Sequence, residues 1–236
     1  MRVKSREAKR PDGGIRPFDR SRVAQALDAL ERRYGRPRLG RSLPPLDELI
    51  LTILSQSTSD LNRDRAYGAL RRRFPTWEDV AQARRVTIEA AIRPGGLART
   101  KSRMIHEMLR GIAAERGSLD LGFLSRLSAE EAAAWLRRFR GVGEKTAACV
   151  LLFSCGHAAF PVDTHIHRIA RRVGWVRPTA GTEETHRRLA SLISPARYLT
   201  GHVNLITLGR RICRPRQPIC PVCPLRRFCR HAAARS

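Results

Sequence analysis

The chain has 236 residues, which is enough for one large domain or two small ones. It carries 46 Lys and Arg residues against 21 Asp and Glu residues, a formal net charge of +25 at pH 7. An excess of this size favours nucleic acid as the partner, because neutralising phosphates releases counterions. A membrane partner fits less well, since the longest apolar run, Ala147 to Phe153, is too short to span a bilayer.

Residues 1–20 contain many basic residues and several Gly or Pro breaks, so we predict a basic disordered arm there. Helical spacing of apolar residues begins after this arm and recurs in four segments. The predicted buried faces are Val23, Ala26, Leu27, Leu30 and Tyr34; Leu46, Leu49, Ile50, Ile53 and Leu54; Met104, Ile105, Met108, Leu109 and Ile112; and Ile166, Ile169, Ala170 and Val173. Ser128 and Glu131 form a capping-box pattern ahead of a further helix. No segment alternates with period two, so the sequence predicts an all-α fold of about ten short helices.

The segment Gly141-Val142-Gly143 precedes a predicted helix that begins near Lys145. Two glycines around a small apolar residue allow a sharp turn, and the N–H groups at a helix start can bind a phosphate. Such a pattern is more often a plain turn between helices. In a chain of charge +25 it predicts a helix-hairpin-helix that contacts a DNA backbone, with Arg140 adding a charge beside it.

Two charged residues stand at predicted helix starts. The helix dipole disfavours a cation at Lys145, which favours the neutral, nucleophilic amine, although a simple phosphate contact is the alternative. Asp163 directly precedes another helix, where an N-cap is the default interpretation. A carboxylate at that point could also stabilise a cation that develops in a cleft. His165 and His167 do not predict a metal site, because i,i+2 side chains point to different sides of a helix.

Four cysteines, Cys213, Cys220, Cys223 and Cys229, lie close together with the spacing C-x6-C-x2-C-x5-C, which predicts a metal centre. Disulfides are disfavoured, because no secretory signal is found and we expect a reducing intracellular compartment, the cytoplasm or nucleoid. Structural zinc sites usually have two short Cys hooks and this segment has one, whereas a [4Fe-4S] cubane tolerates uneven loops. The spacing alone favours the cubane only slightly over zinc.

The longest loop between these cysteines carries Arg214 and Arg216. These arginines either keep the segment soluble or form a basic finger that contacts phosphates.

Three motifs together resemble the endonuclease III family of helix-hairpin-helix DNA glycosylase/AP lyases with a [4Fe-4S] cluster. They are the segment from Gly141 to Ala147, the segment from Val162 to His165, and the four cysteines; the resemblance runs from about Leu46 to Cys229. It implies two closely packed helical lobes with a DNA groove between them. Residues 45–158 would form a six-helix barrel with the hairpin. The second lobe would join an N-terminal helix in residues 21–44 to residues 159–236 and the cluster.

The resemblance also implies roles for individual residues. Lys145 would be the amine nucleophile, Asp163 the essential carboxylate, and the four cysteines the cluster ligands. The implied DNA contacts are Arg140, Gly141, Val142, Gly143, Gln56, Leu97, Arg214 and Arg216. The chain departs from the family where the hairpin begins Phe139-Arg140-Gly141 instead of Leu-Pro-Gly, and where the Ile-Gly-Leu loop reads Gly95-Gly96-Leu97. The family's pocket Gln falls on either Gln56 or Ser57.

We therefore expect a monomeric, bifunctional DNA glycosylase/AP lyase of base excision repair. Its substrate would be double-stranded DNA with oxidised pyrimidines or abasic sites, and no membrane would be involved. One alternative is a monofunctional mismatch or other damaged-base glycosylase, although mismatch relatives carry Ser or Tyr at the position of Lys145. A second alternative is an inactive damage-binding iron–sulfur protein. A third is a zinc-stapled nucleic-acid-binding protein, and only this zinc protein would be colourless.

Overall fold

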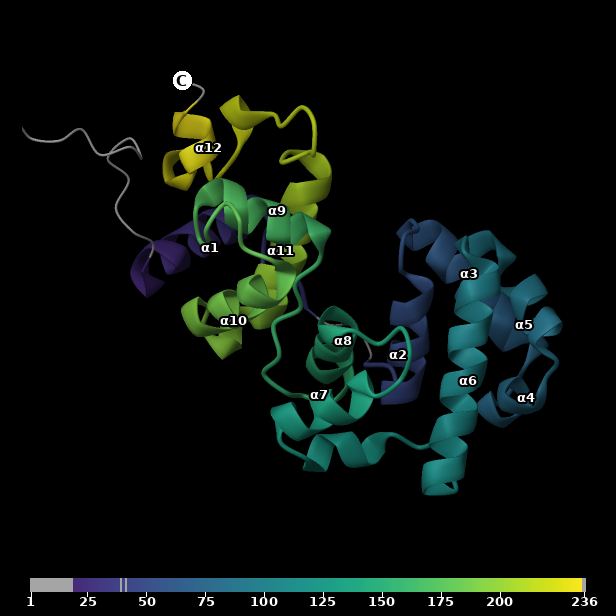
Figure 1. The fold of residues 1–236 in the computed structure, drawn as a ribbon. Helices are drawn as coiled ribbons and strands as arrows, with labels where there is room; N and C mark the ends of the chain where they lie inside the picture. The colour runs from purple at the N-terminus through teal and green to yellow at the C-terminus, as the bar shows by residue number, and fades with distance from the viewer. Residues whose placement is uncertain (1–18, 39, 41, 235–236) are drawn as a thin grey trace, which may run out of the picture. The chain divides into compact units, whose positions relative to one another are not determined.

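The computed structural model describes residues 19–38, 40 and 42–234, and every regular element among them is helical (Figure 1). The predicted all-α fold class is thereby confirmed, with twelve α-helices and five short 3-10 helices in these ranges. No helix in the described part is long and apolar enough to cross a membrane. The predicted basic arm, residues 1–20, lies outside the described residues except for Asp19 and Arg20, which cap and begin the first helix.

The chain divides into two compact units. Unit 1 comprises Met1–Arg38 and Val162–Ser236, and unit 2 is the intervening segment Leu39–Pro161. The elements of unit 2 are α2 (Pro45–Leu54), α3 (Asp60–Arg73), α4 (Trp77–Gln82), α5 (Arg85–Ala91), η1 (Arg93–Gly95), α6 (Ala98–Arg116), η2 (Gly122–Arg126), α7 (Ala129–Arg137) and α8 (Glu144–Ser154). Those of unit 1 are α1 (Arg20–Tyr34), α9 (Thr164–Val173), α10 (Thr182–Leu192), η3 (Pro195–Arg197), α11 (Tyr198–Arg211), η4 (Cys220–Val222), η5 (Arg226–Phe228) and α12 (Arg230–Ala233).

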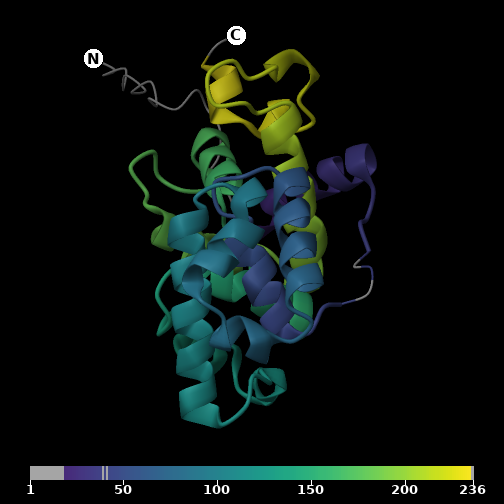
Figure 2. The same cartoon turned by 90° about the vertical axis from the view of Figure 1, so that its right-hand side faces the viewer.

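Unit 2 is built around α2, which lies among α3, α6 and α8 (Figure 2). Pro45 occupies the first turn of α2, where its missing N–H is not needed, and the acidic Asp47 and Glu48 complement the helix dipole. All five residues of the predicted apolar face of this helix are buried. The predicted capping box of α7 is confirmed, because the Ser128 and Glu131 side chains each accept from the other residue's backbone N–H. Amphipathic helices and local caps thus account for this unit.

Unit 1 joins helices from opposite ends of the sequence, with α1 against α11 and α11 against α9 (Figure 1). Arg197 pairs with Asp28 of α1 at 2.8 Å, and the Asn204 amide donates to the carbonyl oxygen of Gly35 at 3.0 Å. The predicted faces of α1 and α9 are buried, apart from Tyr34, which is half-buried. Helix α11 thus packs on both α1 and α9, and α9 begins directly after the predicted carboxylate, Asp163.

Candidate active site and nucleic-acid interface

The hairpin between α7 and α8 has a geometry that needs its first glycine. Gly141 adopts φ +83°, and a Cβ there would lie 2.6 Å from the Met104 Cε atom. Val142 is buried and anchors the turn, while Arg140 is exposed. Gly143 precedes α8, and no side chain caps this helix start. The hairpin therefore leaves the first N–H groups of α8 without a side-chain acceptor, as an anion site requires.

Lys145 is the second residue of α8 and is half-buried. Within unit 2 its charge acts on the Glu48 carboxyl of α2. Burial raises the pKa of Glu48 above the ordinary value of 4.5, while a hydrogen bond from Thr52 and the charges of Lys145 and Arg63 oppose the rise. Glu48 is absent from the predicted site residues, because an acidic residue in a first helical turn is explained equally well by the helix dipole.

Gln56 and Leu97 both lie near strained backbone. The Gln56 amide donates to the carbonyl oxygen of Gly141 at 3.1 Å, so this side chain contacts the hairpin directly. Ser57, the alternative for the same predicted pocket position, has φ +53°. Leu97 occupies the N-cap position of α6 with φ +49°, and the residue is 58% exposed. Unit 2 thus brings Gln56 to the hairpin and presents Leu97 to solvent.

Asp163 caps α9, as its position in the sequence predicts. Its Oδ1 atom accepts a hydrogen bond from the Ile166 N–H at 2.8 Å, and the residue is half-buried. The preceding Val162 is held by a hydrogen bond from its N–H to the buried His186 ring at 3.3 Å. The cap needs one carboxylate oxygen, so the second can serve another partner.

The adjacent histidines of α9 have different surroundings. His167 contacts Thr185 at 2.9 Å, whereas His165 contacts Arg168 at 3.0 Å. The close approach of α11 to His165 requires Gly209, because a Cβ there would lie 2.6 Å from the His165 Cβ. Both histidines therefore pack unit 1 internally.

The cysteine segment is fastened to α9 by two arginines. Arg168 donates to the carbonyl oxygen of Cys213 at 3.0 Å. Arg172 donates to the Cys213 Sγ atom at 3.4 Å and to the carbonyl oxygen of Arg214 at 2.7 Å. The Arg214 and Arg216 residues are themselves exposed. The helix that Asp163 caps is thus the helix that carries this segment.

None of the six cysteines, all of which belong to the described residues, forms a disulfide. Burial raises the pKa of Cys223 to about 11, and the thiolates of Cys213, Cys229 and Cys220 add to the rise. The four thiols of the segment therefore lie within electrostatic range of one another. A guanidinium beside Cys213 would also compensate negative charge on ligating thiolates.

The four thiols form the donor set of the predicted metal centre. Within the described ranges, no three His, Cys, Asp or Glu side chains are placed to hold one metal ion. Around a zinc ion each sulfur lies about 2.3 Å from the metal. A [4Fe-4S] cubane offers a separate iron to each of four thiolates, so its ligands stand farther apart. Four thiols within electrostatic range of one another, beside a guanidinium, match the donor set that a [4Fe-4S] cluster takes.

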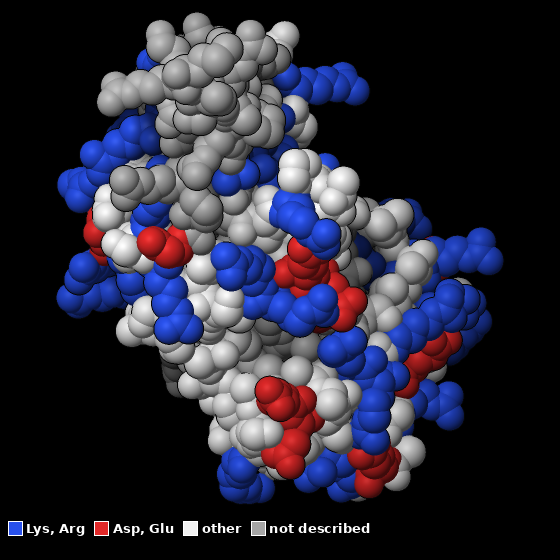
Figure 3. Space-filling model, turned by 60° about the vertical axis from the view of Figure 1, so that its left-hand side comes forward, with Lys and Arg blue, Asp and Glu red and all other residues white. Residues whose placement is uncertain are grey.

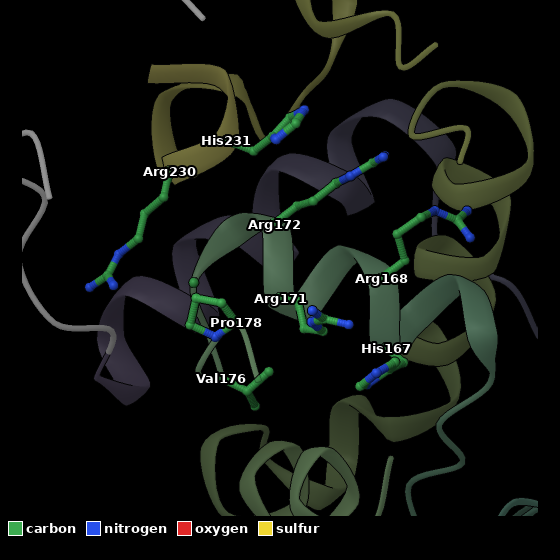
Figure 4. Close-up of a pocket in the computed structure, with 9 residues that line it drawn as sticks. His167, Arg168, Arg171, Arg172, Val176, Pro178, Arg230 and His231 are labelled. Atoms are coloured by element: carbon green, nitrogen blue, oxygen red, sulfur yellow. The ribbon is translucent and has the colours of Figure 1, made fainter. Parts of the chain in front are cut away.

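A basic cavity of about 470 Å³ lies at the end of α9 (Figure 4). Its basic lining residues come from α9 and α12 and are His167, Arg168, Arg171, Arg172, Arg230 and His231. Arg168 and Arg172 are the arginines that hold the cysteine segment, so part of this lining has a structural role. Elsewhere, Lys and Arg side chains spread over the surface, while Asp and Glu form only small groups on the face in Figure 3.

Comparisons with known proteins identify the family of the chain. Residues 50–195 match the family model described as HhH-GPD superfamily base excision DNA repair protein. A candidate DNA glycosylase of Arabidopsis thaliana is 46% identical over 141 residues, which are 60% of this chain and 48% of that protein. The chain thus spans about half the length of this plant relative.

Two further likenesses extend over most of the chain. Endonuclease III of Thermotoga maritima is 33% identical over 193 residues, covering 82% of this chain and 86% of that protein. The solved structure of a non-covalent endonuclease III–DNA complex superposes with a TM-score of 0.79 at 25% identity, covering 92% of this chain and 98% of the other.

Proposed function

Because the chain belongs to the HhH-GPD superfamily of base excision DNA repair proteins, we propose that it is a bifunctional enzyme that excises damaged bases and cleaves the abasic strand. The predicted resemblance to the endonuclease III family and the predicted enzyme class, a DNA glycosylase, are confirmed by this membership. The partner is DNA. The observation that carries the bifunctional proposal is Lys145, a lysine in the first turn of a helix that has no side-chain cap.

Lys145 acts as the nucleophile in this proposal. The damaged base first leaves the stack, since its glycosidic bond is out of reach inside a duplex. The neutral amine then attacks C1′ of the deoxyribose, and the base departs with the electron pair of the glycosidic bond and takes up a proton. The sugar ring opens to a Schiff base. Loss of a proton from C2′ expels the 3′ phosphate, and water releases Lys145.

Asp163 stabilises the positive charge that grows on the sugar as the base departs. A carboxylate with one oxygen in a helix cap is held in place by that bond, and its second oxygen can face the cation. The hairpin from Arg140 to Gly143 binds backbone phosphate, which positions the strand. Leu97 fills the gap left by the extruded nucleotide, as apolar wedges do in other DNA complexes.

The four cysteines would hold a [4Fe-4S] cluster. When bound, the cluster supplies ligation energy to a segment that buries few apolar residues of its own. Arg168 and Arg172 connect this segment to α9, and Arg214 and Arg216 contact phosphate from its longest loop. The segment therefore acts in DNA binding and has no step in the chemistry. Brown protein that absorbs near 400–420 nm would support the cluster, in line with the optics of such clusters in general.

The proposed substrates are oxidised pyrimidines and abasic sites in double-stranded DNA. The test is a panel of duplexes, each with one oxidised pyrimidine, abasic site, mismatch or 8-oxoguanine, scored for base release, strand cleavage and borohydride trapping. We expect trapping and cleavage together, most strongly on oxidised pyrimidines. Base release without trapping would identify a monofunctional glycosylase, and binding without release would identify an inactive damage-binding protein.

A further inference from the structure

Unit 2 buries a lysine that the proposed chemistry does not use. Lys101 of α6 is 1% exposed, and its Nζ atom donates to the carbonyl oxygens of Leu54 at 2.7 Å and Gly95 at 2.8 Å. Burial lowers the pKa of Lys101 below its ordinary value of 10.5. Burying an ammonium group costs free energy unless its N–H donors are hydrogen-bonded. The two hydrogen bonds of Lys101 therefore have to offset the cost of burying its charge.

The two carbonyl groups belong to two strained loops. Leu54 ends α2 and is followed by the segment Ser55–Ser57, in which Ser57 has φ +53°. Gly95 ends η1 and is followed by Gly96 and then Leu97, which has φ +49°. Among the described residues, Ser57 and Leu97 are the two positions other than glycine with positive φ. Such backbone persists only where the surroundings fix it, and it gathers at functional sites.

A second contact connects these loops to the hairpin. Gln56, in the middle of the first loop, donates to the carbonyl oxygen of Gly141 at 3.1 Å. The second loop packs closely on α3, because a Cβ at Gly95 would lie 3.0 Å from the Ala66 Cβ. Lys101 therefore stands between the exposed Leu97 and the segment that contacts the phosphate-binding turn.

We propose that Lys101 is a positioning residue that locks the Ser55–Ser57 and Gly95–Leu97 loops to one another, so that Leu97 enters the duplex at the nucleotide gripped by the hairpin. The locking is a property of the free protein, and only the effect on DNA rests on the proposed function. Lys101 is not a second nucleophile, because its buried amine is turned toward the two carbonyl groups.

Hydrogen exchange on the full-length protein tests the locking without DNA. Lys101→Met keeps an unbranched side chain and removes both donors. We expect exchange to accelerate about tenfold or more at both loops together, since each loses the bond that holds it. Ile112→Val on the same helix removes one buried methylene and is the matched control, with both loops as in wild type. Acceleration at one loop alone, or at neither, overturns the proposal. If Lys101→Met does not fold, Lys101→Gln replaces it, because a shorter amide cannot span both carbonyl groups.

A second measurement connects the locking to DNA. A duplex with a tetrahydrofuran site beside 2-aminopurine reports base unstacking and requires no catalysis. We expect the fluorescence rise to be about fivefold smaller with Lys101→Met, and cleavage of an abasic site in single-stranded DNA to stay within about twofold of wild type, because a single strand has no duplex stack to open. Leu97→Ala should reduce the fluorescence rise to a similar extent, and adding Lys101→Met to it should reduce the rise little further.

The outcomes separate the inference from the proposed function. An equal loss on duplex and single strand, or full additivity with Leu97→Ala, would make Lys101 a general stability residue and overturn the positioning role. Wild-type protein that cleaves no substrate would overturn the proposed function instead, while hydrogen exchange would still decide the locking.

Discussion

The starts of α8 and α9 solve the same problem in opposite ways. Every helix begins with N–H groups that lack intrahelical acceptors. At α9 the Asp163 carboxylate accepts from the Ile166 N–H at 2.8 Å. At α8 the preceding residue is Gly143, no side chain caps the helix, and the first turn carries Lys145. The α9 start is closed by its own acid, whereas the α8 start is open to an outside anion.

This difference separates stability from activity at the two charged residues. Asp163 stabilises its helix, so its removal affects folding as well as any chemistry. The charge of Lys145 opposes the dipole of its helix, and its attraction to the Glu48 carboxyl of α2 offsets this only in part. A lysine at an unfavourable position is therefore better evidence for function than a carboxylate at a favourable one.

The largest expected effect is at the open helix start. Lys145→Gln should abolish borohydride trapping on an abasic duplex, because no amine remains at that position to form the Schiff base. Thermal unfolding should show unchanged or slightly higher stability, by about 0.3–1 kcal/mol, as a cation leaves the positive end of a helix. The variant should still bind the duplex in a filter or fluorescence assay. Trapping at wild-type yield would assign the nucleophile to another amine.

At the closed start, Asp163→Asn separates the cap from the charge. Asn caps about as well as Asp, so stability should fall by no more than roughly 1 kcal/mol. Single-turnover excision should fall by about 10²-fold or more if the carboxylate stabilises the sugar cation. Normal excision by this variant would show that Asp163 is only a structural cap. The start of α9 would then have no role in the chemistry.

A smaller effect is expected from the loop that α9 carries. Replacing Arg214 and Arg216 with Ala should weaken binding to damaged and undamaged DNA alike, and should lower the salt slope by up to about two phosphate equivalents. Excision at saturating protein should stay near wild type. Arg226→Ala with Arg227→Ala is the matched control, since those exposed arginines lie in the neighbouring cysteine loop. Equal losses from both pairs would show that the longer loop has no special role.

The smallest effect comes from giving α8 the kind of start that α9 has. A Cβ at Gly143 meets no atom within 4 Å, and its φ of −88° suits any residue, so Gly143→Ser should fold normally. The new hydroxyl should add a few tenths of a kcal/mol of stability as an N-cap. It should also weaken duplex binding, because it occupies an N–H group that phosphate would use. Tighter binding would contradict an open anion site, and Gly181→Ser at the start of α10 is the control.

Local features of the fold could be predicted from the sequence, whereas the linking side chains could not. The α2 and α9 faces, the Ser128–Glu131 box and the Asp163 cap depend on residues within a few positions of each other, and the structure has all of them. Lys101 has no such signal, because one of its acceptors lies 47 residues earlier in the chain. A lone lysine in an amphipathic helix is normally a surface residue.

In the candidate site, too, features set by neighbouring residues could be predicted, whereas contacts between distant residues could not. The spacing predicts that the four cysteines act as a group, but it carries no information on the Arg172 side chain that donates to the Cys213 Sγ atom from 41 residues earlier. Glu48 was hidden because it becomes a neighbour of Lys145 only when α2 packs along α8. The contact of Gln56 with the carbonyl oxygen of Gly141, 85 residues away, likewise has no local signal in the sequence.

The discontinuous build of unit 1 has a consequence for how the protein is made. Unit 2 is one uninterrupted stretch, complete once residue 161 has left the ribosome, and its α2–α8 core can form at that point. Helix α1 is synthesised first but cannot meet Arg197 and Asn204 until α11 emerges near the end of translation. We therefore expect unit 2 to fold before α1 can pack. Until α11 has been synthesised, the apolar face of α1 should stay exposed to solvent or bound by a chaperone.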